Sequence, residues 1–326
     1  MSIANKLRAA AALVLAAAMA PQAHAQAYPT RPVRIIASTP AGGPQDLLAR
    51  HVAQYLSNAL GQPFIVENKV GANTVIAAQA AAEAPADGHT LLIGSDATIS
   101  INPLLHTRLP YDADGFAPIT LLAQLDQPLF VNFKLPVNSL AEFIAYVHAR
   151  PGQLNYASIG VGSTPHLASE RFLQATGLNM VHVPYKGASE TLPALIADQV
   201  QMSIVALMGA LPLLAAKQIK ALVTSGAKRF PDIPDTPTFA EAGYPQLDFQ
   251  VWFGLMTRKG TPQPVIDKLA DLSSLYVNTD EFRNVLAARY RWTPLGGSQQ
   301  NFAAFLKRDR ETYRRAIELA KIPKSN

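Results

Sequence analysis

The sequence has no cysteine, and that absence excludes several kinds of chemistry at once. Disulfide bridges, cysteine-ligated zinc, iron–sulfur clusters, thiol catalysis and the lipid-modified cysteine of a lipoprotein anchor all require this side chain. The absence does not identify a compartment, because a chain without cysteine is compatible with either redox environment.

Charge is scarce as well, since only 16% of the 326 residues are charged. The formal net charge is +5, and the lysines and arginines are scattered without any run of five. We therefore do not expect nucleic acid as a partner. Hydrophobic residues make up 49%, which excludes an acidic disordered chain, and the length predicts roughly two domains.

Catalytic motifs are missing too. The sequence contains neither the Gly-x-Ser-x-Gly nucleophile elbow nor the zinc-binding His-Glu-x-x-His. Its histidines are dispersed, without the close His and carboxylate spacing of a metal site. We expect no enzymatic activity, no cofactor and no metal. A hydrolase that uses Ser163 stays an alternative, because folding can bring a base and an acid to a serine.

The first 25 residues have the three parts of a secretory signal peptide. Lys6 and Arg8 form a basic start, an apolar run follows over residues 9–20, and Ala23-His24-Ala25 is a small-x-small cleavage site. The apolar run is shorter than the roughly 20 residues of a membrane span, and no later segment is long enough either. We expect cleavage after Ala25, export and a soluble mature chain.

Short strand-like runs alternate with helical periodicities along most of the chain. The pattern predicts strands at residues 33–38, 64–67, 90–94, 129–133, 154–158, 181–183, 200–205 and 219–224. It predicts helices at residues 44–60, 73–84, 140–149, 165–175, 189–197 and 211–217, and amphipathic tail helices at 262–277, 281–288 and 299–320. This alternation indicates an α/β fold with mainly parallel sheets, on which the tail packs without adding a third sheet domain.

The first candidate binding loop runs from Thr39 to Asp46 and has the sequence Thr-Pro-Ala-Gly-Gly-Pro-Gln-Asp. Its two glycines allow a ligand to approach the backbone closely, and Pro44 suits the first helical position. The free amides and the dipole of a helix start attract an anion. Asp46 is placed to cap loop amides from within the first turn. The alternative is an ordinary helix start with glycine for turn geometry.

The second loop, residues 158–166, repeats this design about 120 residues later, with the sequence Ser-Ile-Gly-Val-Gly-Ser-Thr-Pro-His. It matches neither the dinucleotide-binding motif nor the P-loop. Ser163 and Thr164 are candidates to donate hydrogen bonds to a carboxylate, or alternatively to cap the helix. His166 lies in the first turn, where positive charge is unfavourable, so we expect a neutral structural histidine. The two loops together suggest one anion-binding helix end in each domain.

Two more segments follow predicted strands: residues 94–98, which include Ser95, and residues 183–189, which include Lys186. A lone lysine near a turn is more often a solvated surface charge than a ligand contact. In open α/β sheets, ligands bind outside the carboxyl ends of the strands, where all these segments fall. The candidate ligand-binding residues are Pro40, Ala41, Gly42, Gly43, Asp46, Ser95, Ser158, Gly160, Gly162, Ser163, Thr164 and Lys186.

Several motifs occur in order along nearly the whole mature chain. They are residues 28–33 (YPTRPV), 40–43 (PAGG) with Asp46 and Ala49-Arg50, 86–92 (ADGHTLL), 109–112 (LPYD), 151–158 (PGQLNYAS), 182–187 (HVPYKG), 237–238 (PT) with 241–243 (EAG), and 252–255 (WFGL). With these motifs the chain resembles the Bug family of extracytoplasmic solute receptors, the binding proteins of tripartite tricarboxylate transporters.

The resemblance implies a type II periplasmic binding protein, whose two α/β lobes close on a ligand in the cleft between them. It implies a first domain of residues 26–126 and 250–326 and a second domain of residues 127–249, with crossings near residues 125–128 and 249–251. It also implies a small organic carboxylate, held by the loops at 41–43 and 158–164. Integral-membrane transporter subunits are the implied protein partners, and we expect a monomer in the periplasm.

The sequence departs from the family pattern in three places. Ser38-Thr39-Pro40 precedes the glycine pair, and Gly71-Ala72-Asn73-Thr74 stands for the usual glycine-rich segment. Where many relatives have an acidic residue suited to a ligand amino group, this chain has Val205-Ala206. The third departure disfavours an amino-acid ligand and favours a less polar carboxylate. A ligand sensor that feeds a membrane kinase and a secreted hydrolase are the alternative functions.

Overall fold

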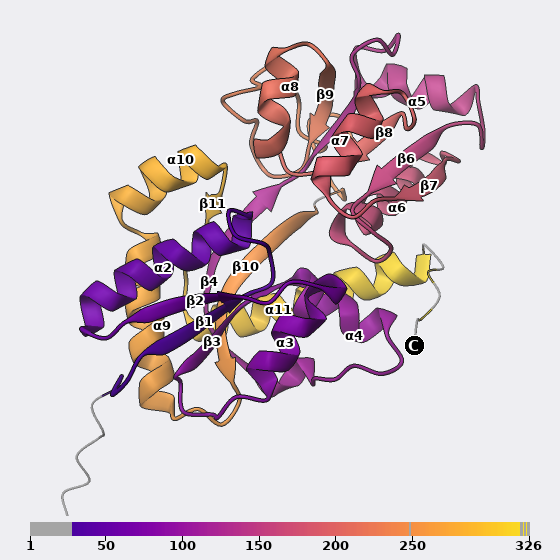
Figure 1. The fold of residues 1–326 in the computed structure, drawn as a ribbon. Coiled ribbons are helices and arrows are strands. Elements are labelled where there is room, and N and C mark those ends of the chain that lie inside the picture. Colours follow the sequence, from indigo (N-terminus) through magenta and orange to yellow (C-terminus); the bar gives the residue numbers. More distant parts are fainter. Residues whose placement is uncertain (1–27, 248, 320–321, 323, 325–326) are drawn as a thin grey trace, which may run out of the picture.

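The computed structural model describes residues 28–247, 249–319, 322 and 324. The expected signal peptide, residues 1–25, lies outside the described residues. Two sheets, each with helices packed on both faces, organise the described chain (Figure 1). We call the parts built on them the first lobe and the second lobe.

The first lobe is built on a six-stranded sheet in the order β11-β4-β10-β3-β1-β2. Its strands are β1 (Val33–Ala37), β2 (Phe64–Asn68), β3 (Thr90–Ser95), β4 (Phe116–Asp126), β10 (Gln250–Arg258) and β11 (Thr293–Pro294). Neighbouring residues of β1 face opposite sides, so Ile35 packs under α2 (Pro44–Leu60) and α9 (Gln263–Val277), while Ile36 packs under α3 (Val75–Ala82) and α11 (Gln299–Leu319). The shorter helices are α4 (Asn102–Leu105) and α10 (Ala287–Tyr290).

The second lobe is built on a five-stranded sheet in the order β7-β6-β8-β5-β9. Its strands are β5 (Pro128–Asn132), β6 (Asn155–Ser158), β7 (Val181–Pro184), β8 (Met202–Ile204) and β9 (Ile219–Thr224). The helices α5 (Leu140–His148) and α6 (Thr164–Thr176) share one apolar core with this sheet, and α7 (Ala188–Ile196) and α8 (Leu211–Ala215) share the other.

The sheets are mixed, so the expectation of mainly parallel sheets is wrong. The pairs β1–β2, β1–β3, β6–β7 and β6–β8 are parallel, as the βαβ pattern predicts. However, β10 runs antiparallel to both β3 and β4, and β5 runs antiparallel to both β8 and β9. The reason is that β4, β5 and β10 adjoin the connections between the lobes and do not belong to simple βαβ units.

Three further differences concern individual elements. The strands β4 and β10 are missing from the sequence-based assignment, although both are long and largely buried. The helix expected at residues 73–84 begins only at Val75, because Ala72, Asn73 and Thr74 all have positive φ, at 45°, 46° and 77°. The tail contributes the short edge strand β11, which pairs with β4 and forms no third sheet.

The chain passes from β4 to β5 through Gln127 and returns to β10 after β9. These crossing segments are tied together, since the Gln127 amide donates to Ser225 Oγ at 2.7 Å and Gln250 Nε2 donates to Asp126 Oδ1 at 2.7 Å. The precise domain bounds, 26–126 with 250–326 and 127–249, stay a prediction.

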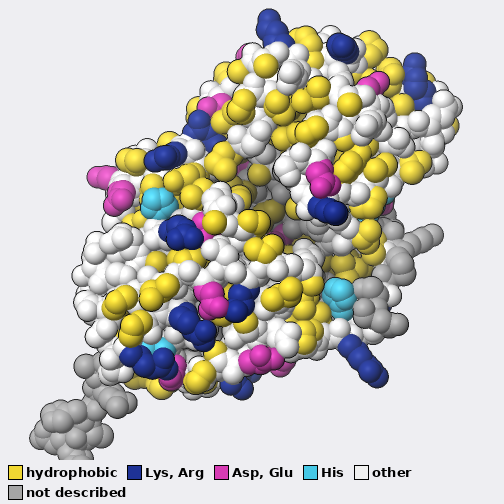
Figure 2. Space-filling view, in the orientation of Figure 1, with side chains coloured by type: hydrophobic (Ala, Val, Ile, Leu, Met, Phe, Trp, Pro, Cys, Tyr) yellow, Lys and Arg dark blue, Asp and Glu magenta, His cyan; other side chains and the backbone are white. Residues whose placement is uncertain are grey.

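The lobes also touch beside α6 and α11. Leu167 of α6 is buried in a cluster with Ile101, Leu105 and Tyr313 of the first lobe. Gly162 approaches the first lobe so closely that a Cβ there would clash with Leu105 Cδ1. Figure 2 shows a hollow between the two lobes in the same orientation as Figure 1. The lobes are therefore in contact on one side of this hollow.

Candidate functional site

The candidate site begins with the β1–α2 loop, which lies on the side of the first lobe that faces the second lobe (Figure 1). Gly42 has φ +82°, which favours glycine, and Gly43 donates its N–H to Pro40 O at 2.9 Å. Pro44 begins α2, as its sequence position predicts. In the part of the chain that the structure describes, the amides of Ala41 and Gln45 have no acceptor. They are the groups that this loop offers to an anion.

Asp46 holds the loop together. Its Oδ2 accepts hydrogen bonds from the Gly42 amide and from Arg50 Nε, both at 2.9 Å, and its Oδ1 accepts one from Asn68 Nδ2 at 2.8 Å. Burial raises the pKa of Asp46, but these three donors outweigh that effect and lower the pKa below its usual value. The expected capping role is confirmed, and the carboxylate positions the loop through contacts within the protein.

The β6–α6 loop of the second lobe has a similar construction. Ser163 caps α6 by accepting the His166 amide, so the capping alternative is confirmed for this hydroxyl, which also donates to Gly160 O at 2.7 Å. Gly160 and Gly162 have φ values of +122° and +75°. Ser158 Oγ accepts the Gly160 amide at 3.1 Å. Among the described residues of this loop, the amides of Val161 and Thr164 have no acceptor.

Two stacked imidazole rings, those of His166 and His182, contact the backbone and a side chain of this loop. His166 and His182 have ring centroids 3.9 Å apart, and His166 Nδ1 accepts the Gly162 amide at 3.0 Å. Burial lowers the pKa of His166 to about 4, and the neighbouring His182 contributes to this shift. His182, whose Nε2 lies 2.7 Å from Ser158 Oγ, also has its pKa lowered to about 4 by burial. Both rings are neutral near pH 7, as we expect for His166.

Asp96, which follows β3, joins the two lobes. Its carboxylate accepts a hydrogen bond from Thr164 Oγ1 of the second lobe and one from the Tyr313 hydroxyl of α11 at 2.9 Å. Burial raises the pKa of Asp96 to about 7, against the effect of these hydrogen bonds. Its neighbour Ser95, a predicted site residue, is also buried and pairs with Thr98 Oγ1 at 3.3 Å.

A second link between the lobes involves Arg291, which follows α10. Its Nη2 donates to Asp232 Oδ1 of the second lobe at 2.6 Å, and both side chains are largely shielded from solvent. Arg291 has φ +58°, an uncommon value for a residue with a Cβ. Figure 1 places α10 and the end of α11 on opposite sides of the first lobe. The lobes are thus bridged by polar contacts in two separate places.

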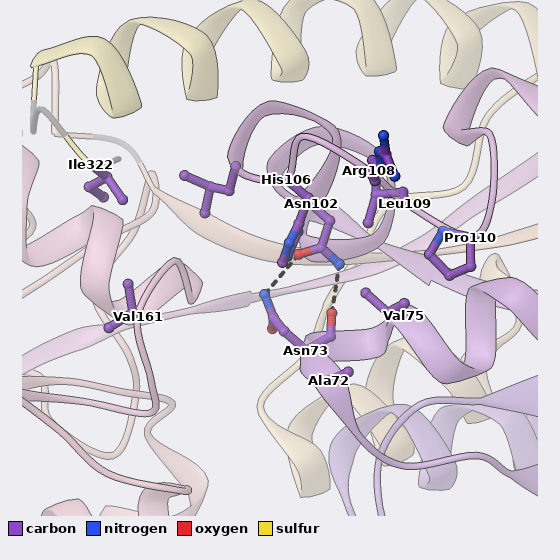
Figure 3. A pocket seen from close by; sticks show the side chains of 11 residues that line it. Ala72, Asn73, Val75, Asn102, His106, Arg108, Leu109, Pro110, Val161 and Ile322 are labelled. Carbon is purple, nitrogen blue, oxygen red and sulfur yellow. Dashed lines mark hydrogen bonds between the residues drawn. The ribbon is translucent and has the colours of Figure 1, made fainter. Parts of the chain in front are cut away.

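A cavity of about 510 Å³ lies where the β6–α6 loop meets the first lobe (Figure 3). The segment before α3 and the chain around α4 form its walls, and Val161 closes it from the second lobe. Asn73 Nδ2 donates to Asn102 Oδ1 at 3.0 Å, and Asn102 Nδ2 donates to Asn73 O at 2.7 Å. This reciprocal pair holds the positive-φ turn that forms one wall.

Lys186 is exposed, and its backbone amide donates to Glu190 Oε2 at 3.0 Å. The structure does not bring it together with the Asp46 and Asp96 groups through any contact of the described side chains. Within the described ranges, no three His, Asp or Glu side chains gather as metal ligands. None of the described helices combines the length and the apolar character needed to cross a bilayer.

Sequence reasoning found both helix starts but missed Asp96, Tyr313 and the Asn73–Asn102 pair. One signal for Asp96 was present, because it directly follows a buried strand in the segment that supplied Ser95. The partners of these groups lie far away in the chain, and Tyr313 is 217 residues from Asp96.

Comparison with known proteins identifies the family of this chain. The model of the TctC family, described as tripartite tricarboxylate transporter family receptor, matches residues 48–321. The chain belongs to this family. Two curated relatives, both from Bordetella pertussis, are a protein of the UPF0065 group and Protein BugT. The first is 36% identical over 79% of both chains, and the second is 33% identical over 82% of both chains.

Solved structures of similar receptors share the fold. A structure of R. palustris Rpa4515 with adipate has a TM-score of 0.82 at 34% identity, over 91% of this chain and 99% of that chain. MatC from Rhodopseudomonas palustris, with bound malate, has a TM-score of 0.76 at 29% identity, over 89% of this chain and 100% of that one. A third, the structure of a periplasmic transporter, has a TM-score of 0.81 at 34% identity, over 91% of this chain and 100% of that chain. The expected fold of a two-lobed periplasmic binding protein and the expected resemblance to the Bug receptors are confirmed.

Proposed function

We propose that this TctC-family chain is a periplasmic receptor that binds a small organic carboxylate between its lobes and delivers it to a membrane transporter. One observation carries the proposal. Each lobe presents a glycine-rich helix start, at Ala41–Gly43 and at Gly160–Thr164, whose loop contains amides without acceptors in the described structure. Such amides, together with the positive end of a helix dipole, stabilise a carboxylate without a cationic side chain.

The side chains around these loops support the same role. The hydroxyls of Ser158, Ser163 and Thr164 and the carboxylate of Asp46 are engaged within the protein, so they shape the backbone. Binding then depends on main-chain donors whose directions are set in advance, which reduces the ordering cost of association. The adipate and malate complexes of structural neighbours support a carboxylate as the ligand class.

Closure of the lobes completes the mechanism. The open receptor exposes both loops to the ligand, and closure buries the ligand between them, so the ligand favours the closed form through contacts that only this form makes. Release to the transporter requires that closure be reversible. Cleavage after Ala25, location in the periplasm, the domain bounds at 126–127 and 249–250 and the absence of catalysis are parts of this proposal.

Thermal stabilisation of the mature chain tests the proposal directly. The chain is titrated with adipate, malate, hexanoate and benzoate, and with their ethyl esters as uncharged controls. We expect saturable stabilisation by at least one acid, none by its ester, and no consumption of the ester when products are followed by chromatography. Ester hydrolysis by the purified chain would instead favour the hydrolase, and no stabilisation by any acid of a broad panel would refute the carboxylate receptor.

A further inference from the structure

The cavity beside the β6–α6 loop has the size and position of a ligand subsite. Its volume of about 510 Å³ lies in the range of small-molecule sites, and both lobes line it. The first lobe contributes Ala72, Val75, Leu105 and Leu109, and the second lobe contributes Val161 (Figure 3). A molecule in this cavity would touch both lobes and would therefore favour their closure.

The lining is mainly apolar where the lobes face each other. Val161 is 63% exposed although it projects from a loop between two lobes. Ile159 on the same loop, and Val70 and Ile76 on either side of the cavity-lining turn, are also among the exposed large hydrophobic side chains. Of these four side chains Val161 is the one that lines the cavity, and an exposed apolar side chain in the wall of a cavity is typical of a ligand-binding surface.

The polar groups of the cavity are mostly used within the protein. Asn73 and Asn102 hydrogen-bond to each other, and this pair fixes the wall. Arg108 is exposed and lies on the side of the cavity away from Val161 (Figure 3). Because Arg108 is exposed, a second carboxylate that paired with it would stay in contact with water and would gain little affinity.

Val161 connects this cavity to the carboxylate loop. Its side chain lines the cavity, while its amide is one of the donors without an acceptor in the described chain. One residue therefore offers both a main-chain donor for a carboxylate and an apolar side chain for the rest of the ligand. Resting on the proposed function, we propose that the preferred ligand is a monocarboxylate with a bulky apolar body, aromatic or branched aliphatic, and that this cavity holds the body.

The decisive experiment compares matched acids that differ by one carboxyl group. Isothermal titration of the mature chain is performed with hexanoate against adipate and with benzoate against terephthalate. We expect each monocarboxylate to bind roughly tenfold more tightly than its dicarboxylate partner, because an apolar wall does not replace the water around a second charge. Tighter binding of the dicarboxylates would overturn the inference and leave the carboxylate receptor intact. Failure of all four acids, and of the broader panel, would refute the receptor itself.

Two substitutions and one control test where the apolar body of the ligand binds. Val161→Thr keeps the shape of the side chain and adds a hydroxyl, and we expect a roughly fivefold loss of benzoate affinity with little change for adipate. Val181→Thr is the matched control, since Val181 is also half-exposed but lies on β7 outside the cavity lining. Arg108→Gln should change benzoate affinity less than Val161→Thr does, because Arg108 lies on the side of the cavity away from Val161. Equal benzoate affinity in Val161→Thr and wild type would overturn the assignment. So would a wild-type chain that prefers adipate and loses adipate binding selectively in Arg108→Gln.

Discussion

Replacement of Asp96 by asparagine should remove the part of the pH dependence of the unfolding free energy that comes from this carboxyl group, which links the two lobes. The carboxyl group is fully buried, and its Oδ2 accepts hydrogen bonds from Thr164 Oγ1 and the Tyr313 hydroxyl. Burial, with a smaller contribution from the charge of Asp309, raises the pKa of Asp96 from 3.8 to about 7. The amide oxygen of asparagine accepts the same two donors, but the amide does not titrate.

The sign follows from the raised pKa. The folded chain holds the Asp96 proton more tightly than the unfolded chain does, so this group contributes its full stability below about pH 4 and loses it as the pH rises through about 7. A shift of this size corresponds to roughly 4 kcal/mol over the whole range and to roughly 2–3 kcal/mol between pH 5 and 8. Asp96→Asn should therefore be the more stable form, relative to wild type, at the alkaline end.

Urea unfolding at pH 5, 6, 7 and 8, followed by tryptophan fluorescence, measures this effect. The difference in unfolding free energy between wild type and Asp96→Asn measures the effect of this carboxyl group, including its interaction with Asp309. Asp309, whose pKa burial raises to about 6, stays in both chains. Asp267→Asn, on the exposed side of α9, is the matched control and should keep the wild-type pH dependence. Parallel pH curves for wild type and Asp96→Asn would refute the reasoning. A variant that is less stable than wild type at pH 8 would show that the ionised group stabilises the fold.

Three further experiments test the first binding loop, the second link between the lobes and Lys186. Gly43→Val should abolish stabilisation by the best carboxylate while the far-UV circular dichroism stays native, because a Cβ there would lie 2.8 Å from Thr39 Oγ1; unchanged stabilisation would remove this loop from the site. Arg291→Ala and Asp232→Ala should show a coupling of roughly 1 kcal/mol in a double-mutant cycle of urea unfolding, and additive losses would show that the pair contributes nothing. Lys186→Ala should weaken carboxylate binding by less than about tenfold in titration calorimetry, as expected for a solvated lysine, whereas complete loss would make it a main ligand contact.

Local patterns in the sequence determined the fold class and both candidate helix starts. The predicted helix at 44–60 matches α2, because Pro44 suits a helix start and Gly61 adopts the left-handed conformation that ends one. Asp46 acts within four residues of the amide that it caps, and His166 accepts an amide four residues away. Interactions of such short range can be recognised without knowing the fold.

The tertiary structure alone decided how the two halves meet. Asp96 and Thr164 are 68 residues apart, and Arg291 and Asp232 are 59 apart, so no local pattern pairs them. The antiparallel course of β10 depends on β3 and β4, and the positive-φ turn at Ala72–Thr74 is held by Asn102 of α4, so both depend on neighbours that are distant in the chain. The cavity at Val161 exists only where the lobes approach each other. Composition and periodicity indicate which side chains of a segment are buried. The ligand site, in contrast, is formed by surfaces of segments that are distant in the sequence, and only the folded chain brings these surfaces together.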